Sequence, residues 1–271
     1  MTPRADAALA ARGLARSRTH AQRLIADGLV TAGGAPVVKA STPVADDVEL
    51  AVAAADHYVS RAAHKLVAGL DAFGVDPAGR VALDMGASTG GFTQVLRERG
   101  AEPVIAVDVG HGQLAASVRE DPGVVVVEGF NVRDLSRASL AAAAGTDAVP
   151  DLVTGDLSFI SLTHVLPYAA QTAAPDADHL LLVKPQFEVG RTGVREGIVT
   201  DPRRRADAVM DVLWAAWDAG LGTCGVIASP IVGGHGNREF VVHLRGRAAT
   251  ARPGGNPTEW MSTVYEQAGA A

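Results

Sequence analysis

The sequence predicts an α/β protein in which a seven-stranded, doubly wound sheet follows a small α+β domain. From residue 80 onward, apolar segments of strand length alternate with segments of helical length, which is typical of βαβ units. Before residue 55, two short helical patterns are instead followed by a hairpin that turns at Gly33-Gly34. A chain of 271 residues is long enough for one substantial core and an accessory domain.

The accessory domain is expected over residues 1–54, with a linker at 55–60. Its two helices are predicted by apolar residues at helical spacing, with a break at Gly13, a new N-cap at Ser17 and an end at Gly28. The hairpin and a further short strand are expected at 29–40 and 48–53.

The larger domain is expected over 61–247, before a partly flexible tail at 248–271. Its strands are expected at 80–85, 103–108, 123–128, 151–155, 178–184, 222–228 and 239–245. Helices are expected at 59–73, 90–99, 111–119, 135–144, 160–173 and 203–219, with one more in the tail at 257–267. Because the loop at 230–237 is short, the last two strands should pair antiparallel at the sheet edge.

Composition excludes several classes of protein. The single cysteine, Cys224, excludes an intramolecular disulfide framework and a zinc site built from cysteines, and we expect no bound metal. The N-terminus lacks the apolar segment of a signal peptide, and no stretch of about 18 apolar residues could span a bilayer. We therefore expect a cytoplasmic protein.

The charge is unevenly distributed. A net charge of −6 argues against nucleic-acid binding over the whole surface. The first 25 residues nevertheless set five arginines against one acid, Asp6; the arginines are Arg4, Arg12, Arg16, Arg18 and Arg23. This segment predicts a local basic face for RNA, with a merely solvated helix face as the alternative.

A glycine-rich turn, DMGASTGGFT at 84–93, follows the first strand of the larger domain. Glycine lets the backbone approach a ligand closely. The G-x-G-x-x-G spacing of nicotinamide enzymes is interrupted by Ser88, and Asp84 would crowd a phosphate. An acidic side chain suits a cofactor with a cationic amino group, such as S-adenosylmethionine. The alternative is a turn that only packs a helix against a strand.

Two further polar residues follow the next two strands. Asp108 is placed to accept hydrogen bonds from ribose hydroxyls, which dinucleotides and methionine-derived cofactors share, and Asn131 is placed to contact an adenine edge. Together with Asp84, they favour a cofactor site over a packing turn.

Four polar residues stand at or beside the ends of predicted segments: Lys65, Asp156, Lys184 and Glu239. Parallel strands bring such residues to one edge of a sheet. Burial disfavours the charged form of a lysine, and a lysine in that state can accept a proton from a hydroxyl. Together with the glycine-rich turn, although neither feature suffices alone, the set predicts methyl transfer to a hydroxyl, and we expect that hydroxyl to be on RNA; any single member could belong to a surface ion pair. Because Lys65 lies near the domain junction, we expect the set to be completed only when the two domains are coupled.

Five segments resemble the TlyA family, whose members are called both rRNA 2′-O-methyltransferases and hemolysins: DMGASTGGFT, VDVGHGQL, DLSFISL, VKPQFE and GNREF. The larger domain is similar to the wider FtsJ/RrmJ-like group. The segment GLARSRTHAQRLIADGLVTAGG resembles an S4-type RNA-binding domain. The resemblance runs from about Arg4 to about Arg245.

The resemblance implies a Rossmann-like, S-adenosylmethionine-dependent methyltransferase. Its substrate would be the 2′-hydroxyl of cytidine in ribosomal RNA of the small and the large subunit, and its catalytic tetrad would be Lys65, Asp156, Lys184 and Glu239, with Lys184 as the base. The expected cofactor residues are Asp84, Gly86, Ser88, Thr89, Gly90, Gly91, Phe92, Asp108, Asn131 and Asp156. The expected RNA contacts are Arg4, Arg12, Arg16, Arg18, Arg23 and Arg61. We expect a monomer that acts on ribosomal subunits and needs no membrane.

Two other functions compete with this one. A membrane-lytic protein would explain the hemolysin name, but the sequence lacks a signal peptide, a spanning segment and a strongly amphipathic basic helix. A non-catalytic RNA-binding or assembly factor could retain the same fold. The intact tetrad argues against it, and binding of S-adenosylmethionine would separate the two.

Overall fold

The computed structural model describes residues 2–26, 28–52, 57–190, 197–233, 236–250 and 252–270. The chain divides into two compact units, with the boundary between His57 and Tyr58. Parts of the expected linker and of the expected loop between the last two strands lie outside the described residues. Among the described helices, none has both the length and the apolar composition that a membrane crossing requires.

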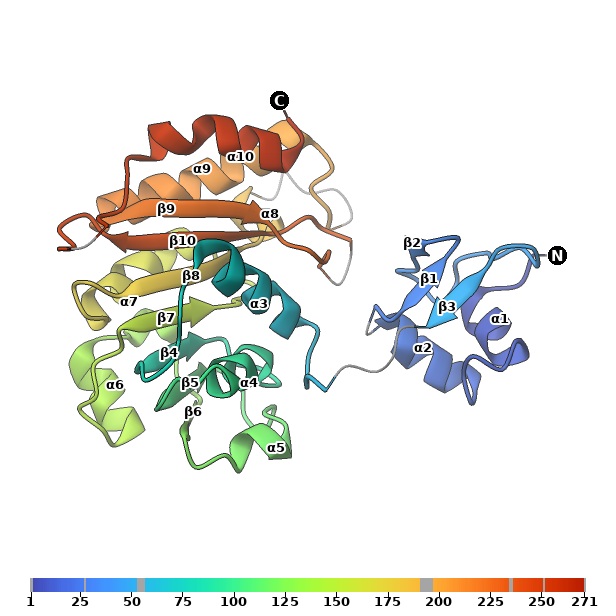
Figure 1. Ribbon diagram of the computed structural model, residues 1–271, viewed down its shortest axis with the longest axis horizontal. Coiled ribbons are helices and arrows are strands. Elements are labelled where there is room, and N and C mark those ends of the chain that lie inside the picture. The colour runs from blue at the N-terminus through green and yellow to red at the C-terminus, as the bar shows by residue number, and fades with distance from the viewer. Residues whose placement is uncertain are drawn as a thin grey trace. The chain divides into compact units, whose positions relative to one another are not determined.

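The first unit packs two helices with a small antiparallel sheet (Figure 1). Its elements are α1 (Ala5–Ala11), α2 (Arg18–Ala26), β1 (Val30–Ala32), β2 (Ala35–Pro36) and β3 (Leu50–Val52), with the strand order β2-β1-β3. Gly33 and Gly34 form the two-residue hairpin loop, and their φ angles of +55° and +79° are the left-handed values that such a loop requires. The core is small and aliphatic, built around Leu9, Ile25 and Val30.

A seven-stranded sheet with the order β6-β5-β4-β7-β8-β10-β9 forms the centre of the second unit (Figure 1). The strands are β4 (Ala82–Met85), β5 (Val104–Asp108), β6 (Val124–Glu128), β7 (Leu152–Gly155), β8 (Asp178–Val183), β9 (Leu221–Ala228) and β10 (Phe240–Gly246). The first five run parallel, whereas β10 is antiparallel to both β8 and β9. The expected doubly wound sheet with an antiparallel edge hairpin is confirmed.

Helices cover both faces of this sheet. They are α3 (Ala62–Phe73), α4 (Gly91–Glu98), α5 (Ala116–Arg119), α6 (Arg137–Ala144), α7 (Leu166–Thr172), α8 (Pro185–Glu188), α9 (Pro202–Asp218) and α10 (Met261–Ala268), with 3₁₀ turns η1 (Val132–Asp134), η2 (Leu162–His164) and η4 (Pro257–Trp260). Successive strand residues point to opposite faces. Leu152 and Leu180 accordingly pack with α3 and α4, whereas Val153 and Leu181 pack with α6, α7, α9 and α10.

Two helices of the second unit depart clearly from their expected bounds. The helix expected at 111–119 is reduced to α5 because Gly112 has a left-handed φ of +65°, which ends any helix there. The helix expected at 160–173 is divided into η2 and α7. Pro167 lacks an amide hydrogen and is tolerated only in the first turn of a helix, so α7 begins at Leu166.

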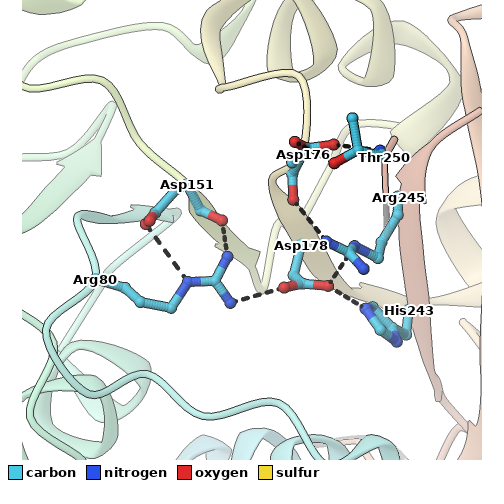
Figure 2. A network of polar contacts seen from close by, with 7 residues as sticks. All are labelled: Arg80, Asp151, Asp176, Asp178, His243, Arg245 and Thr250. Atoms are coloured by element: carbon cyan, nitrogen blue, oxygen red, sulfur yellow. Dashed lines mark hydrogen bonds and ion pairs between the residues drawn. The ribbon is translucent and has the colours of Figure 1, made fainter. Parts of the chain in front are cut away.

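A polar network joins the amino-terminal ends of the parallel strands, at the edge opposite the glycine-rich turn (Figure 2). Asp178, the first residue of β8, accepts hydrogen bonds from Arg80 Nη1 and His243 Nε2, both at 2.7 Å, and pairs with Arg245 Nε at 3.1 Å. Arg80 also donates to the carbonyl of Asp151, just before β7. Burial raises the pKa of Asp178, but the hydrogen bonds from His243 and Arg80 outweigh it and lower the pKa to about 2.

Candidate active site

The turn between β4 and α4 brings the backbone close to the loop that follows β7. Gly86 has a φ of +79°, and a Cβ there would lie 2.9 Å from Leu157 Cδ2 and 3.2 Å from the carbonyl oxygen of Asp156. Ser88 also has a positive φ, +48°, which is strained for a residue with a side chain. The glycine is therefore required by a close backbone crossing at the edge of the site.

A cavity of about 540 Å³ opens at the carboxyl ends of β4, β5 and β7. This volume falls within the range of small-molecule sites. Among its lining residues are Gly86, Ser88, Asp108, Asn131 and Asp156. Thr89, Gly91 and Phe92 line a second, smaller cavity of about 150 Å³ that shares Gly86, Ser88, Asp156 and Ser158 with the first. Gly90 lines neither cavity, and a Cβ there would meet Leu114 and Val118 at 2.9 Å.

Hydrogen bonds fix the two polar residues that follow β5 and β6. Asp108 accepts from the backbone N–H of Ser88 at 2.8 Å and of Gly110 at 2.7 Å, so the carboxylate is held rigidly at the cavity. Asn131 caps η1 by accepting from the N–H of Arg133 at 3.0 Å. Its amide NH₂ is then the group that can donate to a ligand.

Asp84 lies beneath the turn and does not line either cavity. Its side chain is completely buried, and its two oxygens accept hydrogen bonds from Thr93 Oγ1 at 2.6 Å and Thr154 Oγ1 at 3.1 Å. Burial raises the pKa of this carboxyl to about 6, although the threonine hydrogen bonds oppose the shift. The sequence suggests that Asp84 contacts a cofactor amino group directly. Its position beneath the turn does not fit that contact.

The four residues of the predicted tetrad come together as two ion pairs within the second unit. Lys184 Nζ lies 2.6 Å from Asp156 Oδ1 and donates to Ser158 Oγ at 2.8 Å. Lys65 Nζ donates to Glu239 Oε2 at 2.5 Å. Both lysines and Glu239 are more than 90% buried. Pairing is what makes such burial tolerable.

The two ion pairs are neighbours across the β8–β10 ladder. Phe240 faces Val183 in this antiparallel pair, so Glu239 faces Lys184 one step further along. Lys184 and Asp156 line the smaller cavity, whereas Lys65 and Glu239 are not among its lining residues. The tetrad thus has one pair at the cavity and one behind it.

Lys65 is not supplied by a domain junction. It lies in α3, which begins after the unit boundary and packs with α4 and the central sheet. The expectation that domain coupling completes the tetrad is therefore wrong, because the second unit contains both ion pairs.

Sequence reasoning missed residues that hold the loop after β7 against α8. Ser158 bonds to Lys184, and at the other end of α8 the Glu188 carboxylate accepts hydrogen bonds from Ser161 Oγ and from the N–H of Leu162. Burial raises the pKa of Glu188. Both residues lie inside recognised segments, DLSFISL and VKPQFE, but only the fold reveals that these segments bind one another.

Three of the five N-terminal arginines serve the structure of the first unit. Arg4 and Arg18 pair with the buried Asp6, each at 3.1 Å, and Arg12 donates to the carbonyl oxygens of Val48 and Ala45. Burial opposes ionisation of Asp6, but bonds from Gln22, Arg4 and Arg18 dominate and hold its pKa well below the usual range.

The other predicted RNA contacts lie in two places. The side chains of Arg16 and Arg23 are exposed and make no ion pair among the described residues. Arg61 lies at the start of α3, between Ser60 and Ala62, which line the smaller cavity. These three residues are better placed for an external partner than Arg4, Arg12 and Arg18.

The fold and the cavity define a Rossmann-like methyltransferase that uses S-adenosylmethionine. The residues present fit this cofactor: the turn lacks a Cβ at Gly86, Asp108 is a fixed acceptor for hydroxyls, and Asn131 offers an amide donor. Residues 58–246 match the family model of FtsJ-like methyltransferases, and residues 3–50 match the S4 domain. The chain belongs to the FtsJ-like methyltransferases and, within them, to the TlyA family.

Several relatives are similar over most of their length. The 16S/23S rRNA (cytidine-2′-O)-methyltransferase TlyA of Mycobacterium tuberculosis is 50% identical over 245 residues, which cover 89% of each chain. Hemolysin A of Brachyspira hyodysenteriae is 34% identical over 242 residues, 89% of this chain and 99% of that one. A solved structure from Streptococcus thermophilus, which carries a hemolysin name, has a TM-score of 0.75 and 35% identity and covers 98% of this chain and 95% of its own.

Proposed function

We propose that the protein methylates the ribose 2′-hydroxyl of cytidine in ribosomal RNA of both subunits. The observation that carries this proposal is the Lys184–Asp156 pair: both residues line the smaller cavity, and Asp156 also lines the cofactor cavity beside it. The relative from Mycobacterium tuberculosis, named for methylation of cytidine in both rRNAs, supports the choice of substrate.

The protein holds the cofactor with Asp108, Asn131 and the turn around Gly86. When bound, S-adenosylmethionine supplies a methyl group that leaves sulfur without its bonding electron pair and so accepts the pair of an oxygen nucleophile. The chain must then orient the hydroxyl and remove its proton. Lys184 is the group at the cavity that can do both.

Lys184 acts as the base in its neutral form. A neutral amine has two N–H donors and one lone pair. One N–H donates to Ser158, the ion pair with Asp156 holds the amine on a second side, and the lone pair accepts the proton of the hydroxyl. Behind this pair, the Glu239 carboxylate, which faces Lys184 across the ladder, accepts a hydrogen bond from Lys65.

RNA is held by cationic side chains that the first unit does not use internally. Arg16 and Arg23 are exposed on this unit, and Arg61 stands beside the smaller cavity. Guanidinium groups bind phosphates by paired hydrogen bonds. This arrangement supports recognition of the RNA backbone by the first unit and delivery of one ribose to the second.

We expect Lys184→Ala and Lys184→Arg both to abolish methyl transfer to purified ribosomal subunits, as measured with radiolabelled S-adenosylmethionine. Arginine keeps the positive charge but does not lose its proton, so it cannot act as a base. Arg99→Ala, which removes an exposed cation of the same unit, is the matched control and should remain active. Wild-type activity of Lys184→Ala would refute the mechanism, and activity of Lys184→Arg would mean that the charge alone suffices. Mapping of 2′-O-methyl sites in both rRNAs tests the substrate.

A further inference from the structure

Ser158 lies between the two cavities and contacts the proposed base. Its hydroxyl oxygen accepts a hydrogen bond from Lys184 Nζ at 2.8 Å, and its side chain lines the cofactor cavity as well as the smaller one. The residue itself is exposed, so its hydroxyl does not fill the core, and its hydrogen-bond partner is the buried Lys184. The contact with Lys184 is therefore its principal interaction in the described structure.

The position of Ser158 is fixed from both sides. The loop that carries it follows β7, and α8 holds this loop at three points. Lys184 bonds to its start, the Phe187 ring packs 5.3 Å from the ring of Phe159, and Glu188 binds its far end at Leu162, 3.0 Å from the backbone nitrogen. A hydroxyl on a loop held in this way is a fixed acceptor rather than a mobile one.

A second anchor has a specific effect on a lysine. The ion pair with Asp156 locates the amine, but rotation about the Cε–Nζ bond would still let its lone pair point in more than one direction. The hydrogen bond to Ser158 fixes the direction of one N–H bond, and the carboxylate of Asp156, 2.6 Å from Nζ, repels a lone pair that would point at it. Tetrahedral geometry then leaves one direction for the lone pair.

We propose that Ser158 is a positioning residue that aims the lone pair of Lys184 at the substrate hydroxyl. The inference rests on the proposed function, because it assumes that Lys184 is the base. In the step concerned, the O–H bond of the hydroxyl breaks and an N–H bond forms on Nζ. The oxygen keeps the electron pair of the broken bond for its attack on the methyl carbon. Ser158 itself neither gains nor loses a proton.

Ser158→Ala tests this inference in the full-length protein. We expect the single-turnover rate of methyl transfer to fall about tenfold to a hundredfold, the range of a loss of orientation in proton transfer. The dissociation constant for S-adenosylmethionine, measured by calorimetry, and the thermal midpoint should not change. Ser158→Thr retains the hydroxyl at an exposed position and should restore the rate. Ser117→Ala, on the exposed face of α5, is the matched control and should behave as the wild type.

Three results would overturn the inference. A wild-type rate for Ser158→Ala, with Lys184→Ala inactive, removes the role of Ser158 and leaves the proposed function standing. A weaker affinity of Ser158→Ala for S-adenosylmethionine, in proportion to the lost rate, assigns Ser158 to the cofactor. Failure of Ser158→Thr to restore the rate excludes the hydroxyl as the active feature. If Lys184→Ala is itself fully active, the proposed function fails instead.

Discussion

At the scale of single residues, Asp84 shows how burial changes what a carboxylate can do. The sequence places an acid before a glycine-rich turn, which indicates a contact with a cationic ligand. In the structure the side chain lies under the turn, and both of its oxygens are bonded by the hydroxyls of Thr93 and Thr154. A carboxylate in that position supports the turn from below and ties α4 to β7.

We expect Asp84→Asn to stabilise the protein above pH 6. The pKa of Asp84 is raised from 3.8 to about 6, so the folded state binds this proton more tightly than the unfolded state. Ionisation of Asp84 therefore lowers the free energy of unfolding above pH 6, by about 3 kcal/mol at most, and this loss vanishes as the pH falls toward 4. Asparagine removes it and can still bond both threonines.

Urea unfolding at pH 8 and pH 4 measures this effect. The free energy of unfolding of Asp84→Asn should exceed that of the wild type at pH 8, and the difference should shrink at pH 4. Because Asp84 does not line a cavity, the affinity for S-adenosylmethionine should change less than tenfold. A hundredfold loss of affinity would instead indicate that Asp84 contacts the cofactor directly, as the sequence suggests.

At the scale of elements, the two edges of the central sheet have different tasks. The carboxyl ends of the parallel strands carry the cavity and the Lys184–Asp156 pair. The amino ends are joined by the network of Arg80, Asp178 and Arg245 (Figure 2). This network ties β8 and β10 to the segments that precede β4 and β7, at the edge away from the cavity.

Asp178→Asn should destabilise the protein at neutral pH without directly altering the active site. The pKa of Asp178 is lowered from 3.8 to about 2, so its contribution is present above pH 4 and is lost as the pH falls through 2. The shift corresponds to about 2 kcal/mol, and the weaker contacts of Arg80 and Arg245 with a neutral amide add to the loss. Urea unfolding at pH 7 and pH 2.5 should show a difference from the wild type that narrows in acid.

The matched control is Asp71→Asn, which removes an exposed carboxylate paired with Arg99 and should change stability little. Methyl transfer at 25 °C should remain near the wild-type level for both variants. An acid-independent difference for Asp178→Asn would contradict the assigned cause.

At the scale of the whole molecule, the proposed function places the chemistry in the second unit and most of the RNA recognition in the first. In the first unit, Arg4 and Arg18 pair with the buried Asp6, and Arg12 donates to the carbonyl of Val48. Arg16 and Arg23 remain exposed. The basic face is therefore smaller than the number of arginines suggests, and an overall charge of −6 is compatible with it.

Arg16→Ala combined with Arg23→Ala should weaken RNA binding and also its dependence on salt. Each phosphate contact that is lost should reduce the slope of log affinity against log salt by about 0.7 to 0.9, so the double variant should lose about 1.5. Filter binding to ribosomal subunits at several salt concentrations measures the slope. Arg12→Ala should instead lower the thermal midpoint, because it frees the carbonyls of Val48 and Ala45. An unchanged slope for the double variant would mean that phosphates are bound elsewhere.

The strands and the tetrad residues could be predicted because their signals are local. An apolar segment that ends in a lone polar residue marks a strand and the edge of a site, as at Asp156 and Lys184. The contacts that decide the role of a residue were out of reach. Nothing near Ser158 indicates a lysine 26 positions away, and nothing near Arg4 or Arg18 indicates that Asp6 would be buried between them. The N-terminal arginines are evident from the sequence, but the partner of each arginine depends on the fold.

Both ion pairs of the tetrad lie in the second unit. They are therefore separate from the S4 domain, which makes the protein modular. Under the proposed function, the second unit carries the chemistry, while the S4 domain selects the RNA. Such a division would let evolution change the target by exchanging this domain, without rebuilding a buried lysine–carboxylate site. It also invites engineering: the same catalytic unit, fused to a different RNA-binding module, could be directed to a chosen ribose.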